Sequence, residues 1–503
     1  MSDPKIYDIL IIGGGITGAA VARDAAMRGF SVLLVEKGDF CSGTSSRSTK
    51  MIHGGLRYLE QFDFRLVWES LKEREIIKNI APHQIKIVPF LLPVYKGDRF
   101  GPFKVGMGMH LYYWLCPQKE PEAYCFLKPG TALQKEPHLL HEGLLGAGWY
   151  DEYILTSPER FVLSMIQCAR RHGAEVQNYL QAVNFIRDGN QVTGIEAVDT
   201  LNGAQCLIFA KVIVNAAGPW VDDVLRIVKP DVSPKLRVTK GIHFLVPKIS
   251  ECAVLFAAGK DGRLIFGIPW TDYTLIGSTD TDFKENPDDV FANENEVEYL
   301  LTELRRVLNH PAIDRSKIIF TYAGVRPLVL EKGKSESQVS RKHKLFEGDD
   351  EGGIISVAGG KLTTARLMAE QIVDIASKRT GKKTHCTTAK IPLPGGDLPE
   401  QMSFEDYCMN EVHKQSAQFG ISGQTIEHLI HSYGTEYKIV LDLAKKVPEG
   451  KEPLCSHSPA ICGQVNYAVH QEMAKTLLDV VLRLHSLSSP HQKPIMPIHR
   501  RGW

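Results

Sequence analysis

The sequence predicts a mixed α/β (α+β) protein with a Rossmann-like nucleotide-binding domain, an antiparallel-sheet domain and a C-terminal helical domain. Three observations predict this class: a glycine-rich strand-to-helix junction near the N-terminus, two blocks of strand-like apolar runs, and helix-like segments after a Pro/Gly-rich linker. The chain has 503 residues, and about 150 residues per domain gives about three domains.

Composition narrows the class of protein further. Hydrophobic residues make up 43% and charged residues 23% of the chain, which is typical of globular proteins and excludes disordered and fibrous classes. A formal net charge of +1 gives no sign of a nucleic-acid partner. No apolar run reaches the ~18 residues of a transmembrane helix, and we expect no signal peptide. Ten scattered cysteines without a CxxC pair indicate reduced thiols in the cytoplasm and no metal site.

The first predicted element is a buried strand over residues 7–12 that runs directly into a GxGxxG loop. A helix and a second apolar strand follow, and that strand ends in Glu36. The tight turn and the N–H groups of the helix N-terminus suit a pyrophosphate, and Glu36 lies where an acid accepts hydrogen bonds from ribose hydroxyls. This order of elements predicts a dinucleotide site, although the motif alone does not choose between FAD and NAD.

The next segment, residues 41–60, is dense in Gly, Ser and Thr. Its hydroxyls and backbone amides suit a pyrophosphate and a ribityl chain, and two adjacent glycines leave room for a flat ring. A flexible serine-rich linker is the alternative, but four interleaved basic residues disfavour it: Arg47, Lys50, His53 and Arg57. The segment therefore favours a flavin and resembles the FAD-binding region of the D-amino-acid-oxidase-like flavoproteins.

The stretch GTSSRSTKMIHGGLRYLE within this segment is very similar to a signature of the FAD-dependent sn-glycerol-3-phosphate dehydrogenases of the respiratory type. The resemblance covers roughly residues 5–390 and is weaker in the helical tail. Further motifs of that family follow in order: NAAGPW at 215–220, KGIH at 240–243, GSTD at 277–280, AGVRP at 323–327 and AGGKLTTAR at 358–366.

The resemblance implies which residues bind FAD. A strand over 211–215 feeds NAAGPW, and residues 359–363 form a second glycine loop before a helix, where the family places the isoalloxazine ring. Loop amides and the charge of Lys361 suit electron density on a reduced ring; a tight turn or an N-cap is the structural alternative. The residues expected at the cofactor are Gly13, Gly14, Gly15, Ile16, Thr17, Gly18, Glu36, Lys37, Thr44, Ser45, Ser46, Lys50, His53, Gly54, Gly55, Ala217, Gly218, Gly360, Lys361, Leu362 and Thr363.

Candidate substrate-binding residues are cations. The family's substrate is a phosphate monoester, and arginine offers phosphate a planar bidentate fork. The resemblance implies that Arg57 and Arg326, and less directly Arg341, bind this substrate together with Tyr58. Each arginine taken alone is more typical of a solvated surface group.

Oxidation of a secondary alcohol needs a base for the hydroxyl proton while the C2 hydride moves to flavin N5. His243 lies in a strand-like run, and a histidine pKa near ~6.5 suits this task. The resemblance assigns His243 to base catalysis and substrate binding, with Arg326 and Lys361 stabilising the alkoxide. The division of labour between His243 and Arg326 stays open, and a structural histidine is the alternative.

The predicted domains are discontinuous along the chain, because the strand-like runs of the two sheets alternate with each other. A PLPGGDLPE linker precedes helix-like segments near 404–418, 423–432, 435–446 and 462–485. The expected domains are a FAD-binding domain over 1–80, 150–225 and 345–390, a substrate-binding sheet over 81–149 and 226–344, a helical domain over 395–490, and a tail over 491–503.

The resemblance implies an enzyme that oxidises sn-glycerol 3-phosphate to dihydroxyacetone phosphate and passes the electrons to a quinone. It also implies a monotopic protein attached peripherally to the inner face of the cytoplasmic membrane. Lys96, Arg99 and Lys104 flank two phenylalanines and precede an apolar, aromatic run over 105–116. This run is too short to span a bilayer, and it suits an interfacial contact or a buried core or lid helix. A homodimer stays open.

Three other functions remain as alternatives. A glycerol-3-phosphate oxidase would use the same substrate and pass the electrons to O₂. An amine or amino-acid oxidase of the same superfamily would need a carboxylate-binding site. A flavin-binding assembly or regulatory protein without catalysis is disfavoured, because the glycine loops, His243 and the arginines are all present.

Overall fold

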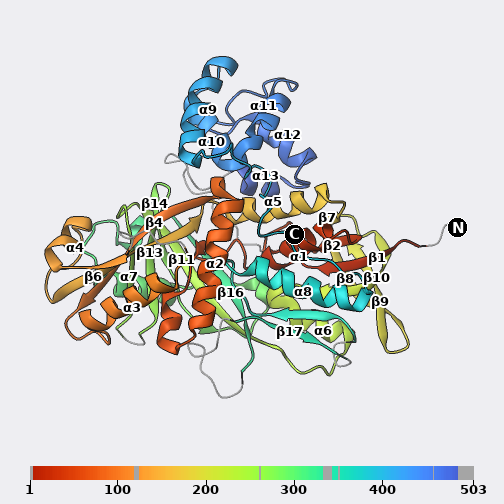
Figure 1. Ribbon diagram of the computed structural model, residues 1–503, viewed down its shortest axis with the longest axis horizontal. Coiled ribbons are helices and arrows are strands. Elements are labelled where there is room, and N and C mark those ends of the chain that lie inside the picture. Colours follow the sequence, from red (N-terminus) through yellow and green to blue (C-terminus); the bar gives the residue numbers. More distant parts are fainter. Residues whose placement is uncertain are drawn as a thin grey trace.

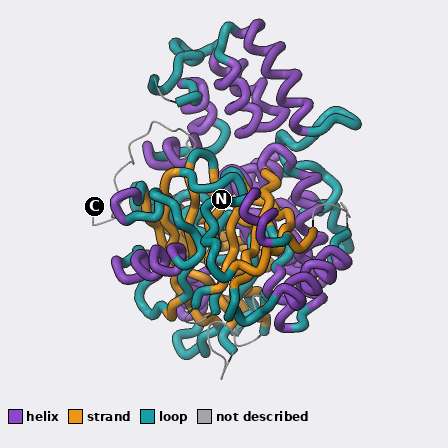
Figure 2. The backbone as a smooth tube through the Cα atoms, turned by 90° about the vertical axis from the view of Figure 1, so that its left-hand side faces the viewer, coloured by secondary structure: helices purple, strands orange, loops and turns teal. Residues whose placement is uncertain are grey.

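The computed structural model describes residues 4–117, 124–259, 262–331, 342–348, 352–456 and 458–484. Two sheets lie next to each other with a region of helices above them (Figure 1), and Figure 2 shows those helices as a layer apart from the strands. This mixed architecture confirms the predicted fold class.

The first sheet carries the glycine loop and is formed by β1 (Ile6–Ile12), β2 (Val32–Glu36), β7 (Glu175–Asn178), β8 (Leu180–Asp188), β9 (Gln191–Asp199), β10 (Gln205–Asn215), β17 (Lys344–Glu347) and β18 (Ile355–Ala358). Its parallel core has the order β18, β10, β1, β2, β7, and the other strands add antiparallel pairs. Because both faces are covered, β1 sends Ile9 and Ile11 into one core and Leu10 and Ile12 into another.

Helices cover both faces of this sheet. α1 (Ile16–Met27), α5 (Pro158–Arg171) and α8 (Ala365–Thr380) pack together on one face, and α6 (Val221–Val228) packs on the other. The small side chains of Ala19 and Ala22 keep α1 close to its neighbours. The start of α1 is thereby fixed at the carboxyl end of β1, where dinucleotide sites form.

The second sheet is mostly antiparallel and is formed by β3 (Met51–Ile52), β4 (Ile85–Tyr95), β5 (Tyr124–Leu127), β6 (Leu144–Leu155), β11 (Leu236–Pro247), β12 (Ala253–Ala257), β13 (Leu264–Trp270), β14 (Tyr273–Gly277), β15 (Thr281–Asp282) and β16 (Phe320–Val329). β4 and β12 pair in parallel. β6 pairs with β4 along nearly its whole length, so the expected domain boundary at residue 150 falls inside a strand of this sheet.

Helices α2 (Phe64–Ile80), α3 (Pro102–Leu115), α4 (Pro129–Lys135) and α7 (Glu294–Arg305) accompany the second sheet. α7 packs against one face, where Leu300 shares a core with Ile242. α2 bridges the two sheets, because Leu71 enters the core of the second sheet and Ile77 enters that of the first. Within the described ranges, no helix is both long and apolar enough to cross a membrane.

The C-terminal region contains α9 (Phe404–Phe419), α10 (Gly423–Tyr433), α11 (Tyr437–Ala444), α12 (Cys462–His470) and α13 (Leu477–Leu484). The expected single helix over 462–485 is two helices, because Met473 takes a left-handed φ of +61° between them. Asp479 then accepts hydrogen bonds from the backbone N–H groups of Lys475 and Thr476 and starts α13 afresh.

Candidate functional site

The glycine loop joins β1 to α1 and requires glycine at two positions. Gly13 has a φ of +109°, and a Cβ there would lie 2.6 Å from the carbonyl oxygen of Ala216. A Cβ on Gly18 would overlap the carbonyl oxygen of Gly13. Gly15 is the N-cap of α1 and provides no side-chain cap, while the N–H of Ile16 donates to Ser45 Oγ at 3.0 Å. The helix N-terminus therefore has only small groups near it, as an anion site requires.

Glu36 ends β2 and reaches back to this loop. Its carboxylate accepts hydrogen bonds from the N–H groups of Gly14 at 2.6 Å and Gly38 at 2.9 Å. Burial raises the pKa of Glu36, and the two N–H groups oppose that shift. Lys37 turns away toward Asp288, at 2.9 Å, and lies over the ring of Trp220.

The Ser/Thr segment after β2 lies along β16. The hydroxyl of Thr44 donates to the carbonyl of Val325 at 2.6 Å, and that of Tyr322 donates to the carbonyl of Ser48 at 2.9 Å. Lys50 is buried, and its ammonium donates to the carbonyl of Ser46 at 3.1 Å. The segment is thus a fixed wall between the two sheets rather than a flexible linker.

His243 lies on β11, faces this wall and is only 2% exposed. Its Nε2 is 3.0 Å from Thr49 Oγ1, and its ring stacks on that of Tyr322 with centroids 4.9 Å apart. A Cβ on Gly277 would overlap the imidazole, so glycine at that position makes room for the ring. Burial, followed by the charges of Arg326 and Lys50, holds the pKa of His243 well below its ordinary value of 6.5.

Arg326 lies on β16, on the same face as His243, since Arg326 pairs with Thr239 and Tyr322 pairs with His243. Its guanidinium contacts the 277–280 turn, donating to Ser278 Oγ at 2.7 Å and to the carbonyl of Thr279 at 3.0 Å, and it pairs with Asp280 at 3.1 Å. A Cβ on Gly241 would overlap this guanidinium. The GSTD and KGIH motifs therefore hold Arg326 in one place.

The second glycine loop, before α8, lies beside both Arg326 and the His53–Tyr58 segment. The N–H of Gly359 donates to the carbonyl of Pro327 at 2.8 Å, and the N–H of His53 donates to Thr363 Oγ1 at 3.1 Å. Lys361 donates to Ser70 Oγ at 3.2 Å, and its ammonium lies 3.8 Å from the ring centroid of Tyr58. The structure thus brings Lys361 and Tyr58 together.

The remaining predicted residues lie around these groups. Gly54 packs closely against Tyr112, because a Cβ at that position would overlap the Tyr112 hydroxyl. Arg57 is half-buried in the 3₁₀ turn η1 (Leu56–Gln61), and its charge acts on Glu60. Arg341 lies outside the described residues. The other predicted positions are Thr17 in the first turn of α1, Ala217 and Gly218 after β10, Gly55 before η1, and Gly360 and Leu362 before α8.

Four residues that contact the site were not singled out from the sequence: Thr49, Tyr322, Ser278 and Asp280. Tyr322 carries one usable signal, because strand alternation puts it on the face of Arg326. A cavity of about 640 Å³ borders Lys240 and Glu296. It opens on the other face of β11 from His243, since neighbouring strand residues point to opposite faces, so it is not part of this site.

These residues fit a flavin dinucleotide. The Gly13–Gly18 loop and Glu36 would hold the adenosine and pyrophosphate end. The loops around Gly54 and Gly360 would hold the ring end, because these glycines let the backbone pack tightly, whereas a Cβ there would overlap Leu71 or Met368. The fold and the site define a flavin-binding oxidoreductase. In agreement, residues 8–374 match the family model of FAD dependent oxidoreductases, and residues 386–493 match the C-terminal domain of alpha-glycerophosphate oxidase.

Curated relatives identify the family within this class of flavin-binding oxidoreductases. The aerobic glycerol-3-phosphate dehydrogenases of Staphylococcus epidermidis and Staphylococcus aureus are 37% and 38% identical over 95% of this chain and 86% of theirs. The chain therefore belongs to the FAD-dependent glycerol-3-phosphate dehydrogenases.

Solved structures agree with this assignment. The glycerol-3-phosphate dehydrogenase from Bacillus halodurans complexed with FAD is similar with a TM-score of 0.78 and 34% identity, over 97% of this chain and 87% of that one. The glycine oxidase of Geobacillus kaustophilus, at 21% identity and a TM-score of 0.55 over 77% of this chain and 98% of that one, shares the fold alone.

Proposed function

We propose that this chain oxidises sn-glycerol 3-phosphate to dihydroxyacetone phosphate and delivers the electrons to a quinone. The observation that carries the proposal is a buried imidazole, His243, on the same strand face as Arg326, whose guanidinium is held by the 277–280 turn. The curated relatives support the choice of substrate, because they match nearly the whole chain. FAD, once bound, supplies the acceptor for the hydride from C2 of the substrate.

The cations of the site neutralise and orient the phosphate dianion. Arg326 is partly neutralised by Asp280, so it serves as a fixed donor of hydrogen bonds more than as an isolated charge. Lys361 and Arg57 supply further positive charge from the adjoining loop and turn. The substrate is thereby held with its C2 hydroxyl toward the imidazole.

His243 takes the hydroxyl proton at Nε2. Thr49 belongs to the cofactor-binding segment and is the partner of Nε2. Its hydroxyl donates to Nε2 when the ring is the Nδ1–H tautomer, which presents the Nε2 lone pair toward the cofactor side. The substrate hydroxyl then replaces that of Thr49 as the donor. Because the pKa of His243 is held low, the ring is neutral and ready to accept a proton at neutral pH.

The acceptor is tested by steady-state turnover of the FAD-loaded enzyme. We expect reduction of a short-chain ubiquinone or menaquinone analogue that depends on glycerol 3-phosphate, with little hydrogen peroxide. Stoichiometric peroxide under air, unchanged by added quinone, would make the protein an oxidase instead. That second candidate is kept because residues 386–493 match a domain described for an oxidase.

We also propose that the protein works at the inner face of the cytoplasmic membrane as a monotopic protein. One side of α3 presents Phe103, Met107 and Trp114 to solvent, with Phe103 83% exposed and Trp114 69% exposed. Phe64 and Trp68 are exposed on the adjacent α2. The opposite side of α3 is buried through Met109 and Tyr112, so apolar side chains lie on both sides of the helix. Such a surface suits the lipid interface.

The membrane surface is tested by sedimentation with vesicles of phosphatidylglycerol and phosphatidylethanolamine. Phe103→Ser with Trp114→Ser is expected to lower the bound fraction at least tenfold. The matched control, Leu201→Ser with Leu207→Ser, removes exposed apolar side chains from the β9–β10 end of the molecule, away from α3 (Figure 1), and should leave binding unchanged. An equal loss of vesicle binding in both double variants would show that α3 is not the membrane-binding surface.

A further inference from the structure

The loop that follows β2 is seated directly on the glycine loop. Besides the Glu36 carboxylate, the N–H of Cys41 donates to the carbonyl of Gly14 at 3.0 Å. The ring of Phe40 lies against Gly14, where an added Cβ would be 2.7 Å from the ring edge. The position of residues 37–41 therefore sets the position of the backbone that faces the dinucleotide.

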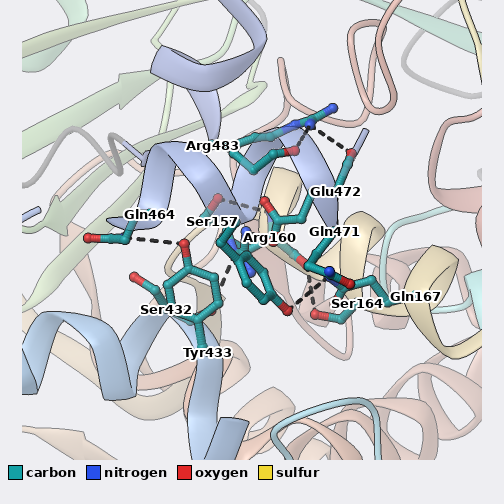
Figure 3. Close-up of polar contacts among 12 residues, drawn as sticks. Ser157, Arg160, Ser164, Gln167, Ser432, Tyr433, Gln464, Gln471, Glu472 and Arg483 are labelled. Atoms are coloured by element: carbon teal, nitrogen blue, oxygen red, sulfur yellow. Dashed lines mark hydrogen bonds and ion pairs between the residues drawn. The ribbon is translucent and has the colours of Figure 1, made fainter. Parts of the chain in front are cut away.

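Asp39, in the middle of this loop, is held by the C-terminal region. Its Oδ1 pairs with Arg483 Nη2 at 2.6 Å and accepts a hydrogen bond from Asn178 Nδ2 at 2.9 Å. Arg483 is fixed in turn by the carbonyl of Glu472 at 2.7 Å and that of Ala468 at 3.3 Å, and Figure 3 shows it pointing toward the Glu472 segment. Arg483 is 4% exposed and the Asp39 side chain 12%, so the pair is largely shielded from solvent.

A second contact fixes the neighbouring residue of the loop. The N–H of Tyr179 donates to the carbonyl of Gly38 at 2.9 Å, and its hydroxyl donates to Asp479 Oδ1 at 2.6 Å. Lys475 donates to the carbonyl of Asn178 at 3.0 Å. The segment that contains α13 thus holds Asp39 directly and Gly38 through Tyr179, although it is more than 400 residues away in sequence.

We propose that α13 is a clasp on the FAD site. Arg483, and Asp479 through Tyr179, hold the Gly38–Asp39 loop on the glycine loop, so that docking of the helical region and binding of FAD reinforce each other. Removing Arg483 leaves a largely shielded carboxylate without its cation, which favours displacement of the loop. Two sites coupled in this way change each other's affinity by the same factor, typically 5- to 150-fold.

The test is the affinity of the apoprotein for FAD, measured by quenching of flavin fluorescence. Arg483→Met and Asp39→Asn are each expected to raise the Kd about tenfold, and the double variant should be no weaker than the single ones, because they remove one pair. Arg171→Gln is the matched control. It breaks the ion pair with Glu436, which also ties α5 to the helical region but does not contact the loop, and it should leave the Kd unchanged.

A reciprocal readout separates the clasp from a general loss of folding. FAD should protect the linker near residues 390–400 of the wild-type protein from limited proteolysis, and Arg483→Met should weaken that protection. If Arg483→Met fails to fold, Tyr179→Phe, which removes only the hydroxyl that donates to Asp479, should still raise the Kd about threefold. An unchanged Kd in folded variants, additive effects in the double variant, or an equal effect of Arg171→Gln would overturn the proposal.

Discussion

At the residue scale, the site depends on side chains whose position is set by missing Cβ atoms. Gly241 leaves room for the guanidinium of Arg326, and Gly277 leaves room for the ring of His243. Both glycines lie within motifs that were visible in the sequence. The hydrogen bond between Thr49 and His243 was not, because the two residues are 194 positions apart and sequence spacing gives no register between them.

The first residue-scale prediction concerns Gly241→Ala. The new Cβ would displace the guanidinium of Arg326 from the 277–280 turn. We expect the KM for glycerol 3-phosphate to rise about tenfold, or ~1.4 kcal/mol, with FAD binding unchanged. The control is Gly267→Ala, where the nearest atom is an ordinary 3.4 Å away. A KM that moves equally in both variants contradicts the assigned role of Arg326.

The second residue-scale prediction concerns the pH profile. A base with a lowered pKa stays unprotonated until the pH falls below that pKa, so kcat/KM should not decline until the pH is below 6.5. Lys50→Gln removes a nearby positive charge and should move the acid limb toward higher pH. Rates must be expressed per substrate dianion, because the second pKa of a phosphate monoester is itself near ~6. A decline that begins above pH 6.5 argues against His243 as the base.

At the element scale, the strands and glycine loops could be predicted because their signals are local. The GxGxxG junction appears as β1, the loop and α1, and the strand-like runs between residues 230 and 345 appear as β11, β13 and β14. The continuity of β6 across residue 150 could not be predicted, since it follows from pairing with β4. The break before α13 was also hidden, because Met473 is a good helix former that takes a left-handed φ.

The element-scale prediction distinguishes two effects of replacing a glycine in the first glycine loop: backbone strain at positive φ and overlap of the new Cβ with neighbouring atoms. Gly13 and Gly97 both have positive φ values, +109° and +96°, but only Gly13 has backbone atoms where a Cβ would stand. Gly13→Ala should weaken FAD binding at least a hundredfold, whereas Gly97→Ala should lower stability by about 1 kcal/mol and leave FAD affinity intact. Titration of both variant apoproteins with FAD measures the two affinities. Equal affinities would mean that the Gly13–Gly18 loop does not hold the dinucleotide.

At the scale of the whole molecule, the helical region is attached to the first sheet by buried charges as well as apolar packing. Arg160 of α5 pairs with Glu472, and Tyr433 and Gln464 join the same network (Figure 3). The linker and the helices were visible in the sequence. Their docking on the cofactor domain was not, since Arg483 looks like any surface arginine until its partner Asp39 is known.

The whole-molecule prediction concerns stability and pH. Burial lowers the pKa of His83 to about 3 and lowers that of His243 well below 6.5. Below pH ~6.5 the unfolded chain binds these protons and the folded one does not, so the free energy of unfolding falls as pH drops, by ~1.4 kcal/mol per pH unit for each histidine.

Urea unfolding between pH 7.5 and pH 5 measures this dependence. His83→Asn should reduce the slope by the contribution of that one histidine. A slope that His83→Asn leaves unaltered would show that His83 does not enter the folded state as the neutral form.

The central claim is that this site oxidises glycerol 3-phosphate, and it is tested most directly without any acceptor. The FAD-loaded protein is mixed anaerobically with glycerol 3-phosphate, and the absorbance of bound FAD near 450 nm is followed. The account predicts rapid bleaching by glycerol 3-phosphate, none by glycerol or glycine, and bleaching slowed at least a hundredfold in His243→Gln with FAD still bound. Retained absorbance of the wild-type protein at saturating glycerol 3-phosphate would contradict it.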